Sequence, residues 1–269
     1  MYKRQVYDAK TLRQIQFFDP PAGALTLKYD SDPARSRLFR GLRTGFDILE
    51  VPDGTKVQTT GTFGMGSIHR IDFSPNLSSM YVLGENYLGR YDAKLERVTL
   101  ERPSKDVPQG VWCEVMAIRP DASEVLVGYG RHVVFLHSQT LKSLRPGWAA
   151  GDDILDARYT PDSAAVLVGR RDNMAELLNA TTGERLGRSM PHARAVTSVA
   201  ISPDGSLFLT GSRDSTARFW DAKTGLPLGP PLRHSGPVTH VAFASTGDRV
   251  VTGTALGQVA LWGVPQDQK

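Results

Sequence analysis

The chain is short of the features that mark several protein classes. It has one cysteine, Cys113, among 269 residues, which excludes a disulfide framework within the chain and fits a reducing compartment. No apolar run approaches the length that spans a bilayer, and the polar start MYKRQVYDAK lacks the apolar stretch of a signal peptide. We therefore expect a cytoplasmic location and no membrane insertion.

A strong charge of either sign is also missing. The net charge is +4, the isoelectric point is near 9.2, and charged residues make up 22% of the chain. This mild excess favours acidic partners, but a nucleic-acid interface needs clustered Lys and Arg, so no nucleic-acid partner is expected. Glycine and proline are spread along the chain, without a linker or a charged tail. The sequence therefore indicates one continuous domain, residues 1–269.

What the chain does have is an internal repeat. The anchors of this repeat are Tyr7, Leu49, Tyr91, Leu136, Leu178, Trp220 and Trp262. Successive anchors are 42 residues apart, except for one gap of 45 residues between Tyr91 and Leu136. A constant period of this size indicates one supersecondary unit that is copied and stacked.

The copy at residues 192–231 shows what this unit is. A short, β-branched apolar run suits a strand buried on both faces, and Pro203 with Gly205 favours a type I turn after it. The four expected strands are Val196–Ile201, Leu207–Gly211, Ala217–Trp220 and the more polar Leu226–Leu232. Four short strands per 42 residues predict a four-stranded antiparallel blade and an all-β fold. A sandwich would not repeat at this period, whereas a β-propeller does.

The segment HARAVTSVAISPDGSLFLTGSRDSTARFWDAKTG strongly resembles the WD repeat, and HSGPVTHVAFASTGDRVVTGTALGQVALW is similar to it as well. The resemblance covers nearly the whole chain and weakens towards the N-terminus. It implies a β-propeller of six to seven four-stranded antiparallel blades, the first of them incomplete. The expected repeats lie at about 1–18 (partial), 19–60, 61–104, 105–146, 147–189, 190–232 and 233–269.

The same resemblance implies four bracing side chains in a blade: a His before the first strand, a Ser or Thr on the second, an Asp in the next turn, and a Trp ending the third. The matching residues are His192, Thr210, Asp214 and Trp220, with His234, Thr252 and Trp262 in the last copy. Leu256 takes the Asp position there, and the copy before His192 keeps only Asp172. A linked hydroxyl, imidazole and carboxylate would satisfy a buried indole N–H.

Arginines in the turns between second and third strands are the candidates for partner binding. In a propeller these turns converge on one face, together with the loops before the first strands. The candidate residues are Arg43, Arg131, Arg170, Arg171, Arg194, Arg213 and Arg233. Guanidinium groups on one face suit an acidic or phosphorylated protein or peptide. The alternative is that these are ordinary solvated turn residues.

The sequence predicts a non-catalytic scaffold without a metal or cofactor. A hydrolase triad is disfavoured because the only matching hydroxyl is a strand Thr and no GxSxG segment is present. His132 and His137 are five residues apart, which places them on opposite faces of a strand. Cys113 is expected to be a buried, inert thiol. A propeller hydrolase remains the least favoured hypothesis.

The number of blades is left open by the sequence. The sequence shows seven third-strand anchors but only six first strands, so the chain is expected to begin inside a repeat. The first strands begin near Leu25, Ile68, Val115, Ile154, Val196 and Val238. Residues 12–18 could complete the last copy and close six blades. The favoured alternative is an arc of a larger propeller, because seven repeats need roughly 294 residues.

One segment also points to a larger signalling protein. The segment TGLPLGPPLRHSGPV, residues 224–238, resembles bacterial WD-repeat proteins in which the propeller follows a Ser/Thr protein kinase domain. The chain itself has no Gly-rich phosphate loop and no HRD-type or DFG-type segment. The second hypothesis is therefore a sensor or docking module of a bacterial kinase protein.

Overall fold

The computed structural model describes side chains at residues 68–76, 78–84, 87–92, 99–101 and 113–265. In the earlier part of the chain and at residues 97–98 it describes only the backbone of the strands. The chain divides into two compact units, Lys3–Gly147 and Trp148–Lys269, and each is described by itself. The division coincides with the predicted boundary between the repeats 105–146 and 147–189. The single domain expected from the sequence stays a prediction.

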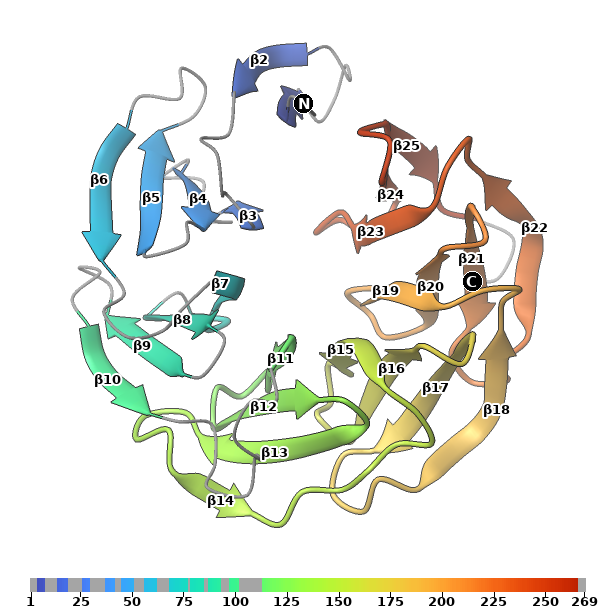
Figure 1. The fold of residues 1–269 in the computed structure, drawn as a ribbon. Coiled ribbons are helices and arrows are strands. Elements are labelled where there is room, and N and C mark those ends of the chain that lie inside the picture. The colour runs from blue at the N-terminus through green and yellow to red at the C-terminus, as the bar shows by residue number, and fades with distance from the viewer. Residues whose placement is uncertain are drawn as a thin grey trace. The chain divides into compact units, whose positions relative to one another are not determined.

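In the first unit, the described chain forms sheets from strands that follow one another in sequence (Figure 1). The strands are β1 (Arg4–Tyr7), β2 (Gln14–Phe18), β3 (Thr26–Tyr29), β4 (Arg37–Gly41), β5 (Gly45–Glu50), β6 (Lys56–Gly61), β7 (Ile68–Phe73), β8 (Ser79–Gly84), β9 (Leu88–Asp92), β10 (Arg97–Glu101), β11 (Val115–Ile118), β12 (Glu124–Tyr129), β13 (His132–His137) and β14 (Ser143–Arg145). β1 and β2 form a two-stranded sheet, and β3–β6, β7–β10 and β11–β14 form four-stranded sheets.

The second unit continues the same plan. Its strands are β15 (Ile154–Tyr159), β16 (Ala165–Arg170), β17 (Met174–Asn179), β18 (Arg185–Pro191), β19 (Val196–Ile201), β20 (Leu207–Ser212), β21 (Thr216–Asp221), β22 (Pro227–Arg233), β23 (Val238–Phe243), β24 (Arg249–Thr254) and β25 (Val259–Gly263). β15–β18 and β19–β22 are four-stranded sheets, and β23–β25 is three-stranded. We call each of these sheets a blade.

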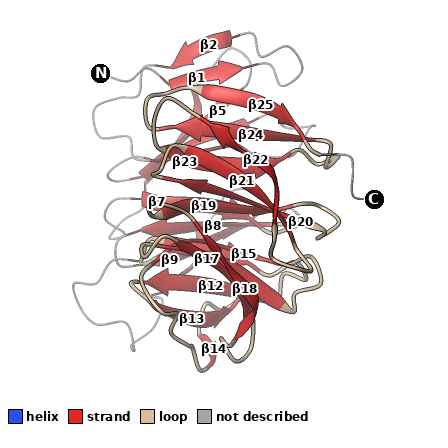
Figure 2. Ribbon diagram, turned by 90° about the vertical axis from the view of Figure 1, so that its right-hand side faces the viewer, coloured by secondary structure: helices blue, strands red, loops and turns tan. Residues whose placement is uncertain are grey.

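The predicted fold class is confirmed. Every regular element that the structure describes is a strand, and neighbouring strands in each sheet run antiparallel (Figure 2). The six first strands begin within one residue of their predicted starts, and six of the seven anchors lie on the third strand of a sheet, while Tyr7 ends β1 of the two-stranded sheet. No helix among the described residues is long and apolar enough to cross a membrane. The number of blades in the complete propeller stays a prediction.

The closure of the propeller stays a prediction. In the six-blade alternative, residues 12–18 complete the last copy. Within the first unit, β2 pairs with β1, and within the second unit, β25 pairs with β24.

Blades in the second unit pack through glycines of their second strands. A Cβ on Gly169 would lie 2.9 Å from Cγ1 of Val196, and one on Gly211 would lie 2.7 Å from Cγ1 of Val238. Each valine begins the first strand of the next blade. The glycine in VLVG and FLTG therefore lets the next first strand approach closely. Apolar side chains such as Val199 fill the space between the sheets.

Tight turns connect the first and second strands of the blades in the second unit. In the turn Ser202–Gly205, the Gly205 amide donates to the Ser202 carbonyl over 2.9 Å, and Gly205 has φ +75°, which favours glycine. The Ser202 hydroxyl donates to Asp204 over 2.6 Å. The same pattern of hydroxyl and carboxylate occurs at Thr160 and Asp162. This places the predicted reversal at the expected residues.

Candidate functional site

The structure brings the four predicted bracing residues of blade β19–β22 together in one hydrogen-bonded chain. The Trp220 indole N–H donates to the Thr210 hydroxyl over 2.8 Å. Nε2 of His192 lies 2.7 Å from that hydroxyl, and Nδ1 lies 2.9 Å from Asp214 Oδ2. Because the hydroxyl accepts from Trp220, it is free to donate to Nε2, which leaves the imidazole proton on Nδ1 facing the carboxylate. Every polar group of these four side chains that takes part in the network then has a hydrogen-bond partner.

The electrostatics of this hydrogen-bond network favour a neutral His192 imidazole beside a charged Asp214 carboxylate. Burial lowers the pKa of His192 and outweighs the opposing effect of Asp214, and Arg218 lowers that pKa further. Burial alone would raise the pKa of Asp214, but hydrogen bonds from Thr216, the Ala193 amide and His192 outweigh it and lower the pKa to about 2. The network therefore keeps one ionised group, Asp214, held by several donors.

The same geometry speaks against the hydrolase interpretation. Thr210 is fully buried, and its hydroxyl lies between the Trp220 indole and His192. A nucleophile must reach a substrate carbonyl, and a hydroxyl enclosed by its own blade has no path to one. The arrangement supports bracing of β19, β20 and β21.

The last blade retains part of the network. Nε2 of His234 lies 2.7 Å from the Thr252 hydroxyl, which accepts the Trp262 indole N–H over 2.9 Å. Leu256 replaces the Asp and is exposed, and Nδ1 of His234 lies 3.0 Å from the Leu232 carbonyl instead. His234 and Trp262 are half-buried, unlike His192 and Trp220.

Blade β15–β18 replaces this network with ion pairs. Arg170 is 7% exposed, and its guanidinium donates to Asp172 over 2.8 Å and to Glu176 over 2.7 Å. The prediction that Arg170 belongs to a partner-binding surface is therefore corrected, because its guanidinium is buried inside its own blade. Sequence reasoning missed Glu176, which has no counterpart among the four bracing residue types.

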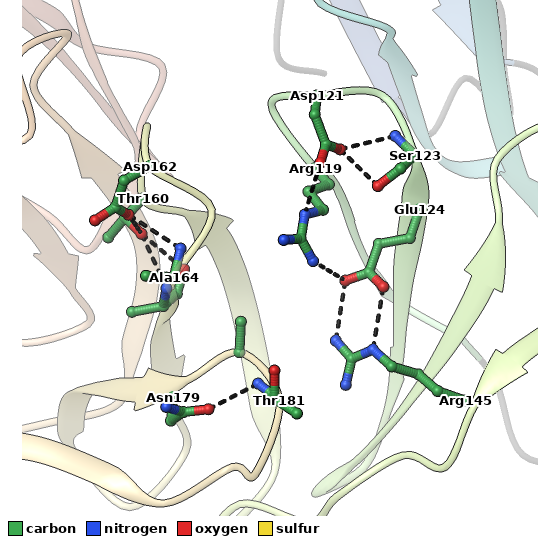
Figure 3. Close-up of polar contacts among 12 residues, drawn as sticks. Arg119, Asp121, Ser123, Glu124, Arg145, Thr160, Asp162, Ala164, Asn179 and Thr181 are labelled. Carbon is green, nitrogen blue, oxygen red and sulfur yellow. Dashed lines mark hydrogen bonds and ion pairs between the residues drawn. The ribbon is translucent and has the colours of Figure 1, made fainter.

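Blade β11–β14 in the first unit uses another ionic arrangement. Glu124 is 2% exposed and accepts two hydrogen bonds from Arg145, of 3.1 and 2.9 Å (Figure 3). Arg119 adds a third contact of 3.4 Å, and the Arg145 guanidinium lies 3.3 Å from the ring centroid of Phe135. Sequence reasoning missed this pair, since Glu124 has no acidic counterpart in the later blades, where Ala165, Leu207 and Arg249 take its position.

A polar contact also joins neighbouring first strands in the second unit. The Asp156 carboxylate, which is buried, accepts the Val199 amide of the next first strand over 3.0 Å. The Ser198 hydroxyl accepts the Val241 amide of the following first strand over 3.1 Å. These side chains satisfy amides next to bulges in β19 and β23. The contacts hold three blades in register.

The candidate arginines of the second unit lie on one edge of its sheets, which we call the loop edge (residues 150–153, 171–173, 192–195, 213–215, 233–237 and 255–258). The Arg213 amide donates to the Ala195 carbonyl over 2.9 Å, and the Arg171 amide donates to Asp153 over the same distance. Arg233 pairs with Thr216 across β21 and β22. The backbone at this edge is therefore held in place.

The side chains at the loop edge differ in their partners. Arg171 is exposed and pairs with Asp153 over 3.0 Å. Arg194, Arg213 and Arg233 are exposed and, in the part of the chain that the structure describes, make no ion pair. Arg131 is an exposed turn residue of the first unit, and Arg43 lies outside the described residues.

The remaining candidates take no part in a site. His132 and His137 are both exposed, at opposite ends of β13. Cys113 is 1% exposed, and burial raises the pKa of its thiol to about 12, so the thiolate is scarce. No group of three potential metal ligands lies together among the residues that the structure describes.

Two segments of the chain, residues 184–221 and 230–263, match the family model of the WD domain, G-beta repeat. Each match runs from the fourth strand of one blade to the third strand of the next. Repeats of this family generally mediate protein–protein interactions, and propellers built from them are typically not enzymes. A search of curated proteins finds no match to the chain.

Proposed function

We propose that the chain is a non-catalytic interaction module that binds a protein or peptide at the loop edge of its blades. The observation that carries this proposal is the set of exposed, unpaired arginines, Arg194, Arg213 and Arg233, on loops fixed by the bracing network. Binding residues are concentrated on loops that a rigid scaffold positions. Unpaired guanidinium groups favour a partner that is acidic or phosphorylated.

Selection of peptides from a random display library on the full chain tests this proposal. The selected peptides are then measured against two charge reversals, Arg213→Glu at the loop edge and Lys223→Glu at the opposite edge. Both residues are exposed turn residues, so they form a matched pair. We expect Arg213→Glu to abolish binding and Lys223→Glu to leave it unchanged. Binders that respond only to Lys223→Glu would contradict the proposal.

A second candidate function rests on the resemblance of residues 224–238 to bacterial kinase-linked propellers. In this case the chain is the sensor or docking module of a larger Ser/Thr kinase protein. The sequence encoded upstream decides between the two: a kinase domain there supports the module, and a stop codon immediately upstream ends it.

The proposal also places the chain in the cytoplasm, because a single buried thiol fits a reducing compartment. Cell fractionation checks that location.

A further inference from the structure

The positive charge of the loop edge is concentrated on one blade. Blade β19–β22 has arginines at four positions: Arg194 before β19, Arg213 in the turn after β20, Arg218 on β21 and Arg233 at the end of β22. The corresponding positions of blade β15–β18, 42 residues earlier, hold Asp152, Arg171, Glu176 and Pro191. In the last blade the first three of these positions hold Gly236, Ala255 and Ala260. The repeat therefore offers an internal comparison in which only one blade is strongly cationic.

Backbone contacts bring these four positions close together. The Ser212 hydroxyl donates to the Arg194 carbonyl over 2.8 Å, directly before Arg213 in the chain. Arg233 pairs with Thr216, whose hydroxyl donates to Asp214. Arg218, on β21 beside the loop edge, pairs with Thr210, whose hydroxyl contacts His192. Three of the four arginines thus lie on the loop edge, and the fourth lies on the strand that leads from it.

Two further observations point to an anion at this place. The Nε atom of Arg218 is buried and, among the described residues, has no hydrogen-bond partner. A buried donor without an acceptor is costly, so an external acceptor would relieve that cost. The Asp214 carboxylate accepts hydrogen bonds from His192, Thr216 and the Ala193 amide. Among the described residues it forms no ion pair with these arginines.

We propose that this arginine cluster of blade β19–β22 binds the phosphoryl group of a phosphorylated serine or threonine in the partner. This inference rests on the proposed function and names the chemistry that the loop edge recognises. A phosphoryl group carries nearly two negative charges and three acceptor oxygens, and several guanidinium forks can share it. A single carboxylate carries one charge and two oxygens, which leaves such a cluster partly unpaired. The neighbouring blades lack the cluster, so the partner is read at one blade.

The test uses degenerate peptide arrays with a fixed central residue, which is phosphoserine, phosphothreonine, serine or glutamate. Peptides that bind the full chain are then measured by titration calorimetry. We expect phosphorylated peptides to bind at least tenfold more tightly than their serine and glutamate forms. Arg213→Ala and Arg233→Ala should each weaken the phosphopeptide about tenfold, since a charge-assisted hydrogen bond contributes that much. Orthophosphate alone should compete, but only weakly.

Lys223→Ala is the matched control, because it removes an exposed cation from a turn at the opposite edge of the same blade. This variant should bind phosphopeptides like the unaltered chain. Arg213→Lys separates charge from the guanidinium fork and should bind at an intermediate level. Circular dichroism verifies that each variant is folded, as expected for exposed side chains.

The outcomes separate this inference from the proposed function. If serine and phosphoserine peptides bind equally, or if Lys223→Ala weakens binding as much as Arg213→Ala, the phosphoryl site is wrong and the interaction module stands. Tighter binding of glutamate peptides would replace the phosphoryl group with a carboxylate and overturn the inference. If no peptide of any class binds, the proposed function fails with it.

Discussion

The hydroxyl of Thr210 provides a sharp test of the bracing network. A Thr210→Val substitution keeps the shape of the side chain and removes only the oxygen that joins Trp220 to His192. The indole N–H, at a side chain that is 2% exposed, would lose its acceptor. A buried donor without a partner costs about 1–3 kcal/mol, and the lost hydrogen bond to the imidazole adds about 1 kcal/mol. We expect the free energy of unfolding to decrease by about 2–4 kcal/mol.

The last blade supplies the control for this prediction. Thr252→Val removes the corresponding hydroxyl, which makes the same two contacts to His234 and Trp262. Thr252 itself is buried, but these two partners are half-buried, so water can reach the indole and imidazole that lose the hydroxyl. The loss there should be about 1 kcal/mol or less. The comparison keeps the chemistry constant and changes only the degree of burial.

Equilibrium unfolding in urea at pH 7, followed by tryptophan fluorescence, measures both losses. A Trp220→Phe background adds a second check, because Thr210→Val no longer strands an indole N–H there. The cost of Thr210→Val should fall by about 1–2 kcal/mol in that background. Equal losses for Thr210→Val and Thr252→Val, or an unchanged cost in the Trp220→Phe background, would refute the reasoning.

Three further predictions concern other contacts in the second unit. Burial lowers the pKa of His192 below its ordinary 6.5, so as the pH falls the unfolded chain binds this proton before the folded chain does. The free energy of unfolding, measured by urea titration, should therefore decrease below about pH 6.5. His192→Gln should reduce this decrease. Gly211→Ala forces a methyl group against the next blade and should lower the free energy of unfolding by about 1–3 kcal/mol. Gly253→Ala has space for the methyl group and should change it by under about 0.5 kcal/mol. Equal effects of the two substitutions would contradict the packing argument. Glu176→Ala leaves a buried guanidinium without this partner and should cost about 3 kcal/mol in thermal and urea unfolding, while Asp153→Ala, at an exposed pair, should cost under about 1 kcal/mol.

The strands were predictable because each level of the sequence agrees about them. In the copy that begins at His192, apolar β-branched runs, turn residues and the spacing of the anchors all indicate the same boundaries. The bracing residues were predictable for a related reason. Their positions relative to the strands are fixed by the blade, so a match in residue type at those positions brings them together.

The ionic contacts were not predictable, because they do not follow the repeat. Arg170 ends β16, whereas Arg171 begins the turn, and the sequence assigned both to an exposed surface. The pleat of the strand and the position of Glu176 decide which of the two guanidinium groups points into the blade. Glu176 does not recur in the repeat, since an arginine takes its position in the next blade. A polar residue in an apolar first strand, such as Asp156, was the available signal for the contact between blades.

The two four-stranded blades of the second unit use arginine in opposite ways. In blade β15–β18, Arg170 is the brace, and its guanidinium forms ion pairs with Asp172 and Glu176. In blade β19–β22 the brace is the chain from Trp220 to Asp214, whose one charge is held locally. The exposed Arg194, Arg213 and Arg233 take no part in that brace and form no ion pair among the described residues. The complete bracing set thus lies on the blade whose exposed arginines carry the proposed binding site.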